Sequence, residues 1–256
     1  MLPPVDAGPG VGVPLLAAWR DASLFLDFDG TLVELAERPE QVQLAPAVLA
    51  TLASLQQLLG GRLALVSGRP IAQLDAMLSP LLLPLAGVHG LERRGFDGVL
   101  HRIAPPDLTA VRAAAHALAA LHPGLWVEEK FGALALHYRQ APALGPLCDA
   151  AMAEAVRQSP GTVLLKGKMV AEIKPAGVDK GSAVCAFLAE VPFAGHAAVF
   201  AGDDVTDEAG FAMVQALGGI GIKVGPGPTV AQLRIASPAA LHDVLQQLLD
   251  VLSRRF

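Results

Sequence analysis

The chain has 256 residues, which suits one large domain or a core with a smaller domain inserted into it. Apolar residues make up 53% of it, enough for a sizeable core, and the net charge of −5 argues against a nucleic-acid-binding protein, because such proteins carry a basic stripe. No apolar run is long enough to span a membrane. Residues 1–13 lack the basic start and apolar block of a signal peptide and are expected to form a flexible lead-in. We therefore expect a cytoplasmic monomer that binds neither membranes nor nucleic acid.

Short apolar runs alternate with longer amphipathic ones along much of the chain. A helix is expected over 45–60, where apolar residues recur at helical spacing and Gly60-Gly61 marks the end. A second helix is expected over 237–252, with Ser237 as its N-cap and Pro238 at its first position. Strands covered on both faces are expected at 23–27, 62–66, 197–201 and 219–224. Strands that alternate with helices predict a parallel, doubly wound α/β sheet.

The order of elements changes between about Pro106 and Pro175. A helix, two strands, a second helix and two further strands are expected there, within 108–122, 125–130, 133–139, 144–158 and 162–174. This order indicates a small α+β unit inserted into the α/β core. We expect core residues 1–106, a cap domain over 107–175 and further core residues 176–256. Cys148 and Cys185 lie in alanine-rich helical patterns and are expected to be buried thiols without a catalytic role.

Polar residues stand where three of the expected core strands end. Asp27, Ser67 and Asp203 each fall at or just past the end of a strand. Ligands of doubly wound sheets bind at the carboxyl ends of the strands, so these three side chains are expected to converge. A turn explains the pair Asp29-Gly30, because Gly accepts a positive φ and Asp bonds its own backbone. A turn explains neither Asp27 nor Thr31.

Four motifs follow one another in a fixed order: "DFDGT" (27–31), "SGR" (67–69), "GVDKG" (177–181) and "GDDVTDE" (202–208). Singly they are weak, because "SGR" is common in turns, a lysine before Gly fits a solvated helix start, and acidic residues suit a helix N-terminus. Together, in this order, they resemble the haloacid dehalogenase superfamily of phosphohydrolases. That resemblance implies a Rossmann-like core with an inserted cap.

The resemblance and the chemistry of phosphate-ester hydrolysis give these residues their expected roles. Asp27 would attack phosphorus and form an aspartyl-phosphate, and Asp29 would protonate the departing alcohol and then deprotonate water. Ser67 and Lys180 would hold the phosphoryl oxygens, and Thr31 would brace the loop.

A metal ion is expected at the same place. A carboxylate approaching a phosphate dianion is repelled by about 4 kcal/mol per charge pair at about 4 Å, at an effective dielectric near 20, so a cation must offset the repulsion. Mg²⁺ prefers oxygen ligands. The expected ligands are Asp27, the main-chain carbonyl of Asp29, Asp203 and Asp207, with Asp207 and Asp204 acting directly or through water.

Three further segments resemble the trehalose-6-phosphate phosphatases: "GVHGLE" (87–92), "EEKFGALALHYR" (128–139) and "GKMVAEIKPAGVDKG" (167–181). With the first and fourth motifs, the resemblance runs from about Asp21 to the C-terminus. It implies a Mg²⁺-dependent phosphatase that converts trehalose 6-phosphate to trehalose and closes its cap over the sugar. The cap residues that would bind the sugar hydroxyls are Glu128, Lys130, Arg139, Lys168 and Glu172. Phe131 departs from the family pattern, which commonly has Gly at that position.

Other residues near the expected site have open roles. Arg69 is expected to bind the phosphate or to link core and cap; His89 is expected to do the same or to make a structural hydrogen bond. His137 is expected to serve strand packing. Lys168 and Glu172 are four residues apart, a spacing that puts them on one face of a helix or of a strand.

Alternative functions remain open at this point. A phosphatase for another sugar phosphate, such as sucrose phosphate, would carry the same core motifs, because sites vary on one fold. A phosphomutase also uses an aspartyl-phosphate, typically with a smaller cap. A catalytically silent sugar-phosphate sensor is a third alternative, against which the intact Asp27, Asp29, Lys180 and Asp203 argue, because a sensor needs no nucleophile.

Overall fold

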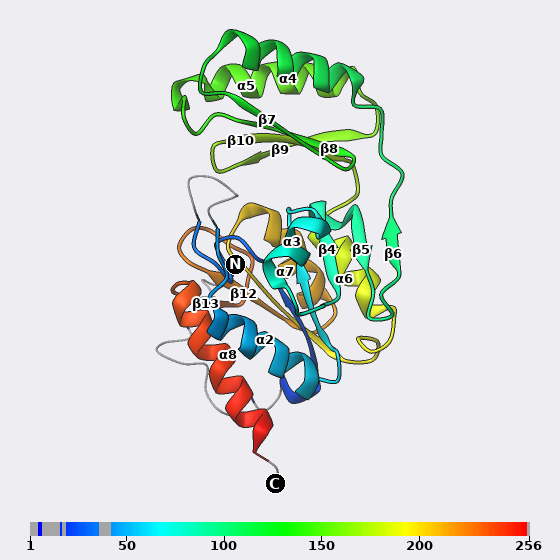
Figure 1. The fold of residues 1–256 in the computed structure, drawn as a ribbon, viewed down its shortest axis with the longest axis vertical. Coiled ribbons are helices and arrows are strands. Elements are labelled where there is room, and N and C mark those ends of the chain that lie inside the picture. The colour runs from blue at the N-terminus through cyan, green and yellow to red at the C-terminus, as the bar shows by residue number, and fades with distance from the viewer. Residues whose placement is uncertain (1–4, 7–15, 17–18, 36–41, 255–256) are drawn as a thin grey trace. The chain divides into compact units, whose positions relative to one another are not determined.

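The computed structural model describes residues 5–6, 16, 19–35 and 42–254 (Figure 1). The flexible lead-in expected over residues 1–13 lies almost entirely outside these described residues. Contacts within the chain divide it into two compact units. We call Met1–His101 with Asp179–Phe256 the core unit, and Arg102–Val178 the inserted unit.

One large sheet runs through the core unit. Among the described residues it has nine strands, in the order β1 (Val5–Asp6), β13 (Leu233–Ile235), β12 (Ile220–Val224), β11 (Ala197–Gly202), β2 (Ala22–Leu26), β3 (Leu63–Val66), β4 (Leu85–Gly87), β5 (Glu92–Arg94) and β6 (Leu100–Arg102). In this order across the sheet, each strand is parallel to the next one from β1 as far as β4. The strand β5 then pairs antiparallel with β4. The four core strands expected from the sequence are confirmed within a residue or two at their ends.

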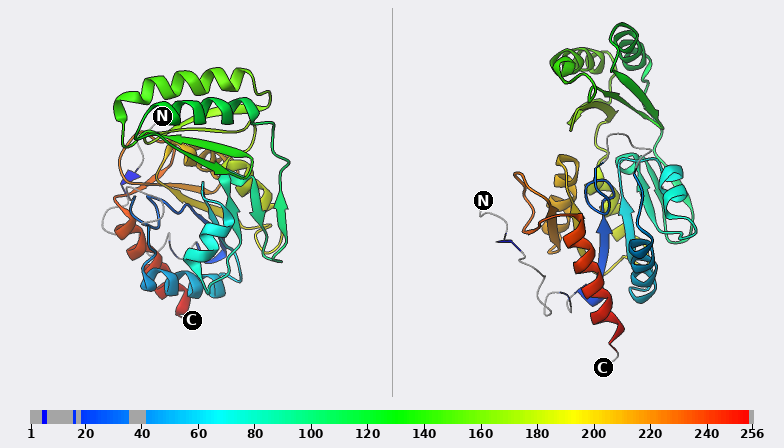
Figure 2. Two further views of the ribbon diagram at one scale, coloured as in Figure 1. Left: turned by 45° about the horizontal axis from the view of Figure 1, so that its top comes forward. Right: turned by 60° about the vertical axis from the view of Figure 1, so that its left-hand side comes forward.

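Helices cover both faces of this sheet. The helices α2 (Pro46–Leu58), α3 (Ile71–Leu78) and α8 (Pro238–Ser253) pack with Leu24 and Leu26 of β2 in one hydrophobic cluster. The helices α6 (Lys180–Leu188) and α7 (Glu208–Ala216) pack with Phe25 of the same strand in another. Successive side chains of a strand point to opposite faces, so an uninterrupted apolar strand buries residues on both. The helix α8 lies alongside α2 in every view (Figures 1 and 2). The doubly wound arrangement is confirmed.

Local sequence signals fix the ends of several helices. Ser237 caps α8 by accepting a hydrogen bond at its side chain from the main-chain nitrogen of Ala240, at 3.2 Å, and Pro238 is the first helical residue, as expected. The helix α2 is followed by Gly60 and Gly61, both at positive φ. Short 3₁₀ helices also occur at η1 (Trp19–Asp21), η3 (Val88–Gly90), η4 (Pro142–Leu144) and η5 (Val205–Asp207).

The inserted unit has the expected order of helix, two strands, helix and two strands. Its elements are α4 (Thr109–Leu121), β7 (Trp126–Lys130), β8 (Ala133–His137), α5 (Gly145–Arg157), β9 (Thr162–Gly167) and β10 (Val170–Pro175). The strands form an antiparallel sheet in the order β7-β8-β10-β9. Buried residues of α4 and α5 pack with Leu134, Leu136 and Ile173 on one face of it.

The two cysteines differ in their exposure to solvent. Cys148 is buried in the inserted unit, as expected, but Cys185 is exposed on α6, so the expectation of two buried thiols is wrong for Cys185. The alanine-rich pattern indicates a helix there without specifying which of its faces packs on the sheet.

Among the residues that the structure describes, no helix has both the length and the apolar character needed to cross a membrane.

Candidate active site

Three predicted site residues stand at the carboxyl edge of the core sheet. Asp27 directly follows β2, Ser67 follows β3 and Asp203 follows β11. At two of these residues the main chain adds one more hydrogen bond to the sheet. The main-chain nitrogen of Asp27 donates to the main-chain oxygen of Ala201, and that of Ser67 donates to the main-chain oxygen of Ala86. All three side chains are buried, with Asp27 only 3% exposed. Parallel pairing of neighbouring strands therefore brings them to one edge.

Lys180 joins two carboxylates at this edge. Its Nζ donates to Asp27 Oδ1 at 2.6 Å and to Asp207 Oδ1 at 2.7 Å. Lys180 is the first residue of α6, which Asp179 caps by accepting from the main-chain nitrogen of Ser182. The hydroxyl of Thr31 donates to Asp27 Oδ2 at 3.0 Å. Each carboxylate oxygen of Asp27 thus accepts a hydrogen bond from a side chain, Oδ1 from Lys180 and Oδ2 from Thr31.

Asp203 is held from several sides. Its main-chain nitrogen donates to Asp207 Oδ2 at 3.0 Å, and its main-chain oxygen accepts a hydrogen bond from Lys223 Nζ. Its carboxylate lies against Gly30, where an added Cβ would come within 2.2 Å of Asp203 Oδ2. Gly30 also has a φ of +79°. The turn after Asp29 therefore requires Gly for its backbone conformation and for the close approach of Asp203.

Burial and crowding shift the pKa values of the cluster. Burial raises the pKa of Asp27, the charge of Lys180 lowers it, and Asp203 and Asp29 raise it again, to a net value of about 6. Burial and the charge of Asp27 raise the pKa of Asp207 to about 6 against the opposing charge of Lys180. Burial lowers the pKa of Lys180, but the charges of Asp207 and Asp27 outweigh it and the net shift is upward. The protein alone does not fully stabilise the negative charge gathered here.

The acidic cluster fits a divalent cation. Within the described part of the chain, the carboxylates of Asp27, Asp203 and Asp207 offer one oxygen each within 4.8 Å of one another. Burial first and charge repulsion second raise the pKa values of Asp27 and Asp207; hard oxygen donors of this kind suit Mg²⁺, and a cation among them would stabilise their negative charge. Both oxygens of Asp207 already accept hydrogen bonds, from Lys180 and from the main-chain nitrogens of Asp203 and Asp204. The side chain of Asp204 is not part of the three-carboxylate group.

Asp29 is paired with Arg69. The Arg69 Nε donates to Asp29 Oδ2 and Nη2 donates to Asp29 Oδ1, each at 2.7 Å. The guanidinium also lies over the ring of Phe28, at 5.7 Å from its centroid. Side chains of Asp29 and Arg69 are 30% and 11% exposed. The second aspartate of "DFDGT" is therefore oriented by the arginine of "SGR".

The loop after β3 is locked to the turn after β4. The main-chain nitrogen of His89 donates to Ser67 O at 2.9 Å, and that of Val88 donates to Arg69 O at 3.0 Å. Val88 and His89 both have positive φ, at 48° and 56°, a strained conformation that marks functional sites when the surroundings enforce it. A Cβ added at Gly68 would lie 2.8 Å from the His89 ring. The main chain at Val88 and His89 thus holds the loop that carries Ser67 and Arg69, and the role of the His89 side chain stays a prediction.

A second polar cluster lies on the inserted unit, on the sheet face opposite α4 and α5. Glu128 of β7 and Glu172 of β10 both lie opposite Ala135 of β8, so the three form one row across the sheet. Lys130 Nζ lies 3.3 Å from Glu172 Oε1 and 3.6 Å from Glu128 Oε2. His137 Nε2 donates to Glu128 Oε2 at 3.0 Å. Three of the five predicted sugar-binding residues are therefore together.

The other two predicted sugar-binding residues lie at one end of the β9–β10 hairpin. Lys168 falls in the turn between these strands, so its expected placement on one strand face with Glu172 is wrong. Arg139 follows β8, is exposed, and donates from Nη2 to the main-chain oxygen of Lys168 at 3.3 Å. A hairpin turn interrupts the even spacing of a strand, and spacing alone does not reveal where the turn falls.

Lys223 was not predicted from the sequence, and His137 makes a hydrogen bond in addition to the strand packing expected of it. Lys223 is 4% exposed and is the last residue but one of the otherwise apolar strand β12, and its Nζ donates to the main-chain oxygen of Asp203. A lysine inside a buried apolar run is itself a signal, because buried charges require partners. His137, expected to serve strand packing, contacts Glu128 and the ring of Trp126, with ring centroids 4.5 Å apart.

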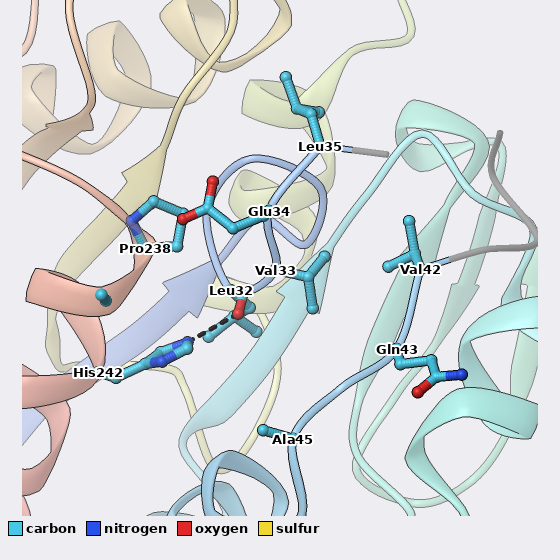
Figure 3. A pocket seen from close by; sticks show the side chains of 10 residues that line it. Leu32, Val33, Glu34, Leu35, Val42, Gln43, Ala45, Pro238 and His242 are labelled. Atoms are coloured by element: carbon cyan, nitrogen blue, oxygen red, sulfur yellow. Dashed lines mark hydrogen bonds between the residues drawn. The ribbon is translucent and has the colours of Figure 1, made fainter. Parts of the chain in front are cut away.

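A separate pocket lies behind the loop that follows Asp29. It has a volume of about 450 Å³ and is lined by Leu32, Val33, Glu34, Leu35, Val42, Gln43, Ala45, Pro238, Ala239 and His242. His242 of α8 points into it and donates from Nε2 to the main-chain oxygen of Leu32, at 2.7 Å (Figure 3). None of the predicted site residues lines this pocket. The hydrogen bond from His242 joins α8 to this loop.

Known proteins are similar to this chain in sequence and in fold. The family model for trehalose-phosphatase matches residues 25–243. Trehalose-6-phosphate phosphatase of Escherichia coli K12 is 43% identical over 90% of this chain and 88% of its own length. The C-terminal domain of Candida albicans trehalose-6-phosphate phosphatase has a TM-score of 0.83 at 24% identity, covering 94% of this chain and 98% of its own. A Bacteroides thetaiotaomicron phosphatase of the haloalkanoate (HAD) superfamily has a TM-score of 0.62 at 16% identity, covering 90% and 95%, and confirms the expected fold. The chain therefore belongs to the trehalose-phosphatase family.

Proposed function

We propose that this protein hydrolyses trehalose 6-phosphate to trehalose and inorganic phosphate. The observation that carries the proposal is the buried Asp27, whose carboxylate is held by Lys180 at 2.6 Å and Thr31 at 3.0 Å beside two further aspartates. Membership of the trehalose-phosphatase family and the names of relatives such as the E. coli enzyme support the substrate. The strained turn at Val88 and His89 supports an active site at the same edge.

The first half of the reaction transfers the phosphoryl group to the protein. The Asp27 carboxylate attacks phosphorus, and the bond between phosphorus and the sugar oxygen breaks. Asp29, two residues along the same loop, gives a proton to the departing sugar oxygen, so trehalose leaves as a neutral alcohol. Thr31 and Lys180 hold the carboxylate of Asp27 in one orientation, which reduces the entropy cost of the attack.

The second half returns the protein to its starting state. Asp29, now a carboxylate, takes a proton from a water molecule, and the water oxygen attacks phosphorus of the aspartyl-phosphate. The bond between phosphorus and the Asp27 oxygen breaks, and inorganic phosphate leaves. The Arg69 guanidinium donates to both oxygens of Asp29 and so holds its carboxylate in one position for this step.

Hydrogen-bond donors at the carboxyl edge of the core sheet bind the phosphate. Lys180 keeps its positive charge because Asp27 and Asp207 raise its pKa, and the hydroxyl of Ser67 is a second donor for the phosphoryl oxygens. Mg²⁺ fits the donor set, with Asp27, Asp203 and the main-chain carbonyl of Asp29 as ligands and Asp207 as a direct or water-mediated one. When bound, the cation would offset the repulsion between the Asp27 carboxylate and the phosphate dianion.

Sugar recognition is assigned to the inserted unit, acting as a cap. Its sheet face carries Glu128, Lys130 and Glu172, and its hairpin end carries Arg139 and Lys168. Carboxylates accept hydrogen bonds from hydroxyls and ammonium or guanidinium groups donate to them, so a disaccharide can satisfy both kinds of group. A site of this type discriminates against sugars that leave its polar groups unpaired.

The test is phosphate release from a panel of esters: trehalose 6-phosphate, sucrose 6-phosphate, glucose 6-phosphate and p-nitrophenyl phosphate. We expect trehalose 6-phosphate to have the highest kcat/KM, EDTA to stop release from every ester, and added Mg²⁺ to restore it. A higher kcat/KM for another sugar phosphate would overturn the substrate assignment. Full activity in EDTA would overturn the metal assignment.

A further inference from the structure

The sheet face that carries Glu128, Lys130 and Glu172 also carries a tryptophan. Trp126 is in β7, two residues before Glu128 and four before Lys130, so all three project from the same side of the strand. Val127, between them, packs instead with the helices on the opposite face. Trp126 is 44% exposed, whereas the side chains of Lys130 and Glu172 are about nine-tenths buried.

Trp126 has a fixed neighbour on this face. His137 of β8 is its direct cross-strand partner, and the two ring centroids lie 4.5 Å apart with an interplanar angle of 30°. His137 is held in turn by its hydrogen bond to Glu128, at 3.0 Å. Contact with a ring that is itself held restricts the indole, so an aromatic surface is pre-organised beside the charged cluster.

The residues of β8 that lie between these side chains are small. Ala135 lies directly between Glu128 and Glu172 across the sheet, and Ala133 lies opposite Lys130. Both alanines are buried, Ala135 at 0% and Ala133 at 1% exposed, and the exposed part of this face consists of the side chains around them: carboxylates and an ammonium group on one part and the rings of Trp126 and His137 on another. A hexose ring has matching surfaces, since its hydroxyls project from its edge and its C–H groups form apolar faces.

We propose that Trp126, packed against the ring of His137, is the apolar platform on which a hexose ring of the substrate packs, with the neighbouring charged groups binding its hydroxyls. This inference rests on the proposed function, because it assigns a part of that substrate to this face. Trp126 is then a specificity-determining residue: burying its exposed ring face against C–H groups favours a glycosyl ligand over a phosphate ester without a sugar.

Two measurements test the platform. The first is tryptophan emission during titration with trehalose, which needs no turnover. The chain has two tryptophans, and Trp19 is 3% exposed in the core unit, so a saturable change in emission reports on Trp126. We expect this change in the wild-type protein and none in Trp126→Phe, whose remaining tryptophan is buried.

The second measurement is steady-state kinetics of Trp126→Ala and Trp126→Phe. We expect Trp126→Ala to raise KM for trehalose 6-phosphate about 5- to 10-fold with kcat within about twofold, and Trp126→Phe, which keeps an aromatic ring, to raise it less than about threefold. KM for p-nitrophenyl phosphate is expected to stay unchanged. Leu121→Ala is the matched control, because Leu121 is an exposed apolar residue of the same unit on α4, and it should change neither KM.

The outcomes separate this inference from the proposed function. An unchanged KM in Trp126→Ala, in a protein that hydrolyses trehalose 6-phosphate, would overturn the platform and leave the function intact. An equal rise in KM for both substrates would also overturn it, because the aryl ester has no hexose ring. If the wild-type protein releases no phosphate from trehalose 6-phosphate, the proposed function fails, and the emission titration still decides whether Trp126 contacts the sugar.

Discussion

The guanidinium of Arg69 holds the carboxylate of Asp29 through two hydrogen bonds of 2.7 Å each. This pairing joins the first two motifs of the site, which are 40 residues apart. A planar guanidinium fixes both the position and the plane of a carboxylate, which a lysine cannot do. Arg69 thereby orients the residue to which we assign both proton transfers.

Arg69→Lys should therefore lower kcat more than it raises KM. We expect kcat to fall about 10- to 100-fold for trehalose 6-phosphate and for p-nitrophenyl phosphate alike, because a small misplacement of the proton donor affects every ester. The measurement is steady-state phosphate release. Arg94→Lys is the matched control: Arg94 also makes two hydrogen bonds of 2.7 Å to one carboxylate, from Nη1 and Nη2 to Asp75, within the core unit but outside the predicted site. Equal losses in both variants would contradict a role specific to Asp29.

Gly30→Ala should abolish most activity through the position of Asp203. The new Cβ would lie 2.2 Å from Asp203 Oδ2, so that carboxylate must move. Gly98 has the same φ of +79° but nothing within 4 Å of its Cβ position. Gly98→Ala should thus reproduce the backbone strain alone, about 1 to 2 kcal/mol of unfolding free energy, without loss of kcat. Activity assays and chemical unfolding of both variants check this; a fully active Gly30→Ala would contradict the packing of Asp203 on the turn.

Glu172→Gln should weaken the binding of the sugar and spare the chemistry. The partner of Lys130 at 3.3 Å would lose its negative charge and one acceptor for sugar hydroxyls would become an NH₂ donor, so we expect KM for trehalose 6-phosphate to rise about tenfold or more. KM for p-nitrophenyl phosphate should change little. Glu154→Gln, at an exposed glutamate of α5, is the control. Similar rises for both substrates in Glu172→Gln would count against a sugar site on this face.

Glu128 should make stability depend on pH in the acid range. Burial raises its pKa, but the hydrogen bond from His137 and the charge of Lys130 outweigh burial and lower the pKa below its usual 4.5. The folded state therefore binds a proton at Glu128 more weakly than the unfolded state does. Its contribution to the free energy of unfolding is present above pH 4.5 and is lost as the pH falls below it.

Unfolding by urea between pH 3 and pH 6 measures this contribution. We expect the difference in unfolding free energy between the wild-type protein and Glu128→Gln to shrink as the pH is lowered through that range. Glu154→Gln, the exposed control, should show a smaller change. A wild-type advantage that grows toward low pH would reverse the assigned direction of the shift.

Local patterns were sufficient to predict much of the fold and part of the site. Apolar runs and caps predicted the core strands and the start of α8 at Pro238, because these signals act over a few neighbouring residues. The rule that ligands lie at the carboxyl ends of strands predicted the meeting of Asp27, Ser67 and Asp203. Lys180 could be added only through its motif, since 153 residues separate it from Asp27.

Other features depend on tertiary packing that no local pattern specifies. The pairing of Arg69 with Asp29 requires two loops to meet, and the reach of Lys223 to Asp203 depends on β11 and β12 being neighbours. The exposure of Cys185 depends on how α6 is rotated against the sheet. Lys168 was misplaced because a two-residue turn falls between strands whose residues otherwise continue one alternating pattern.

Trapping the phosphorylated protein during turnover tests the role of Asp27 most directly. Acid quenching of the protein with trehalose 6-phosphate, followed by mass spectrometry of its peptides, should find one phosphoryl group on the peptide that contains Asp27. Asp27→Asn should keep the fold, carry no phosphoryl group and retain less than about one thousandth of the wild-type kcat. Hydrolysis by Asp27→Asn near the wild-type rate, or a phosphoryl group on a different residue, would contradict the mechanism.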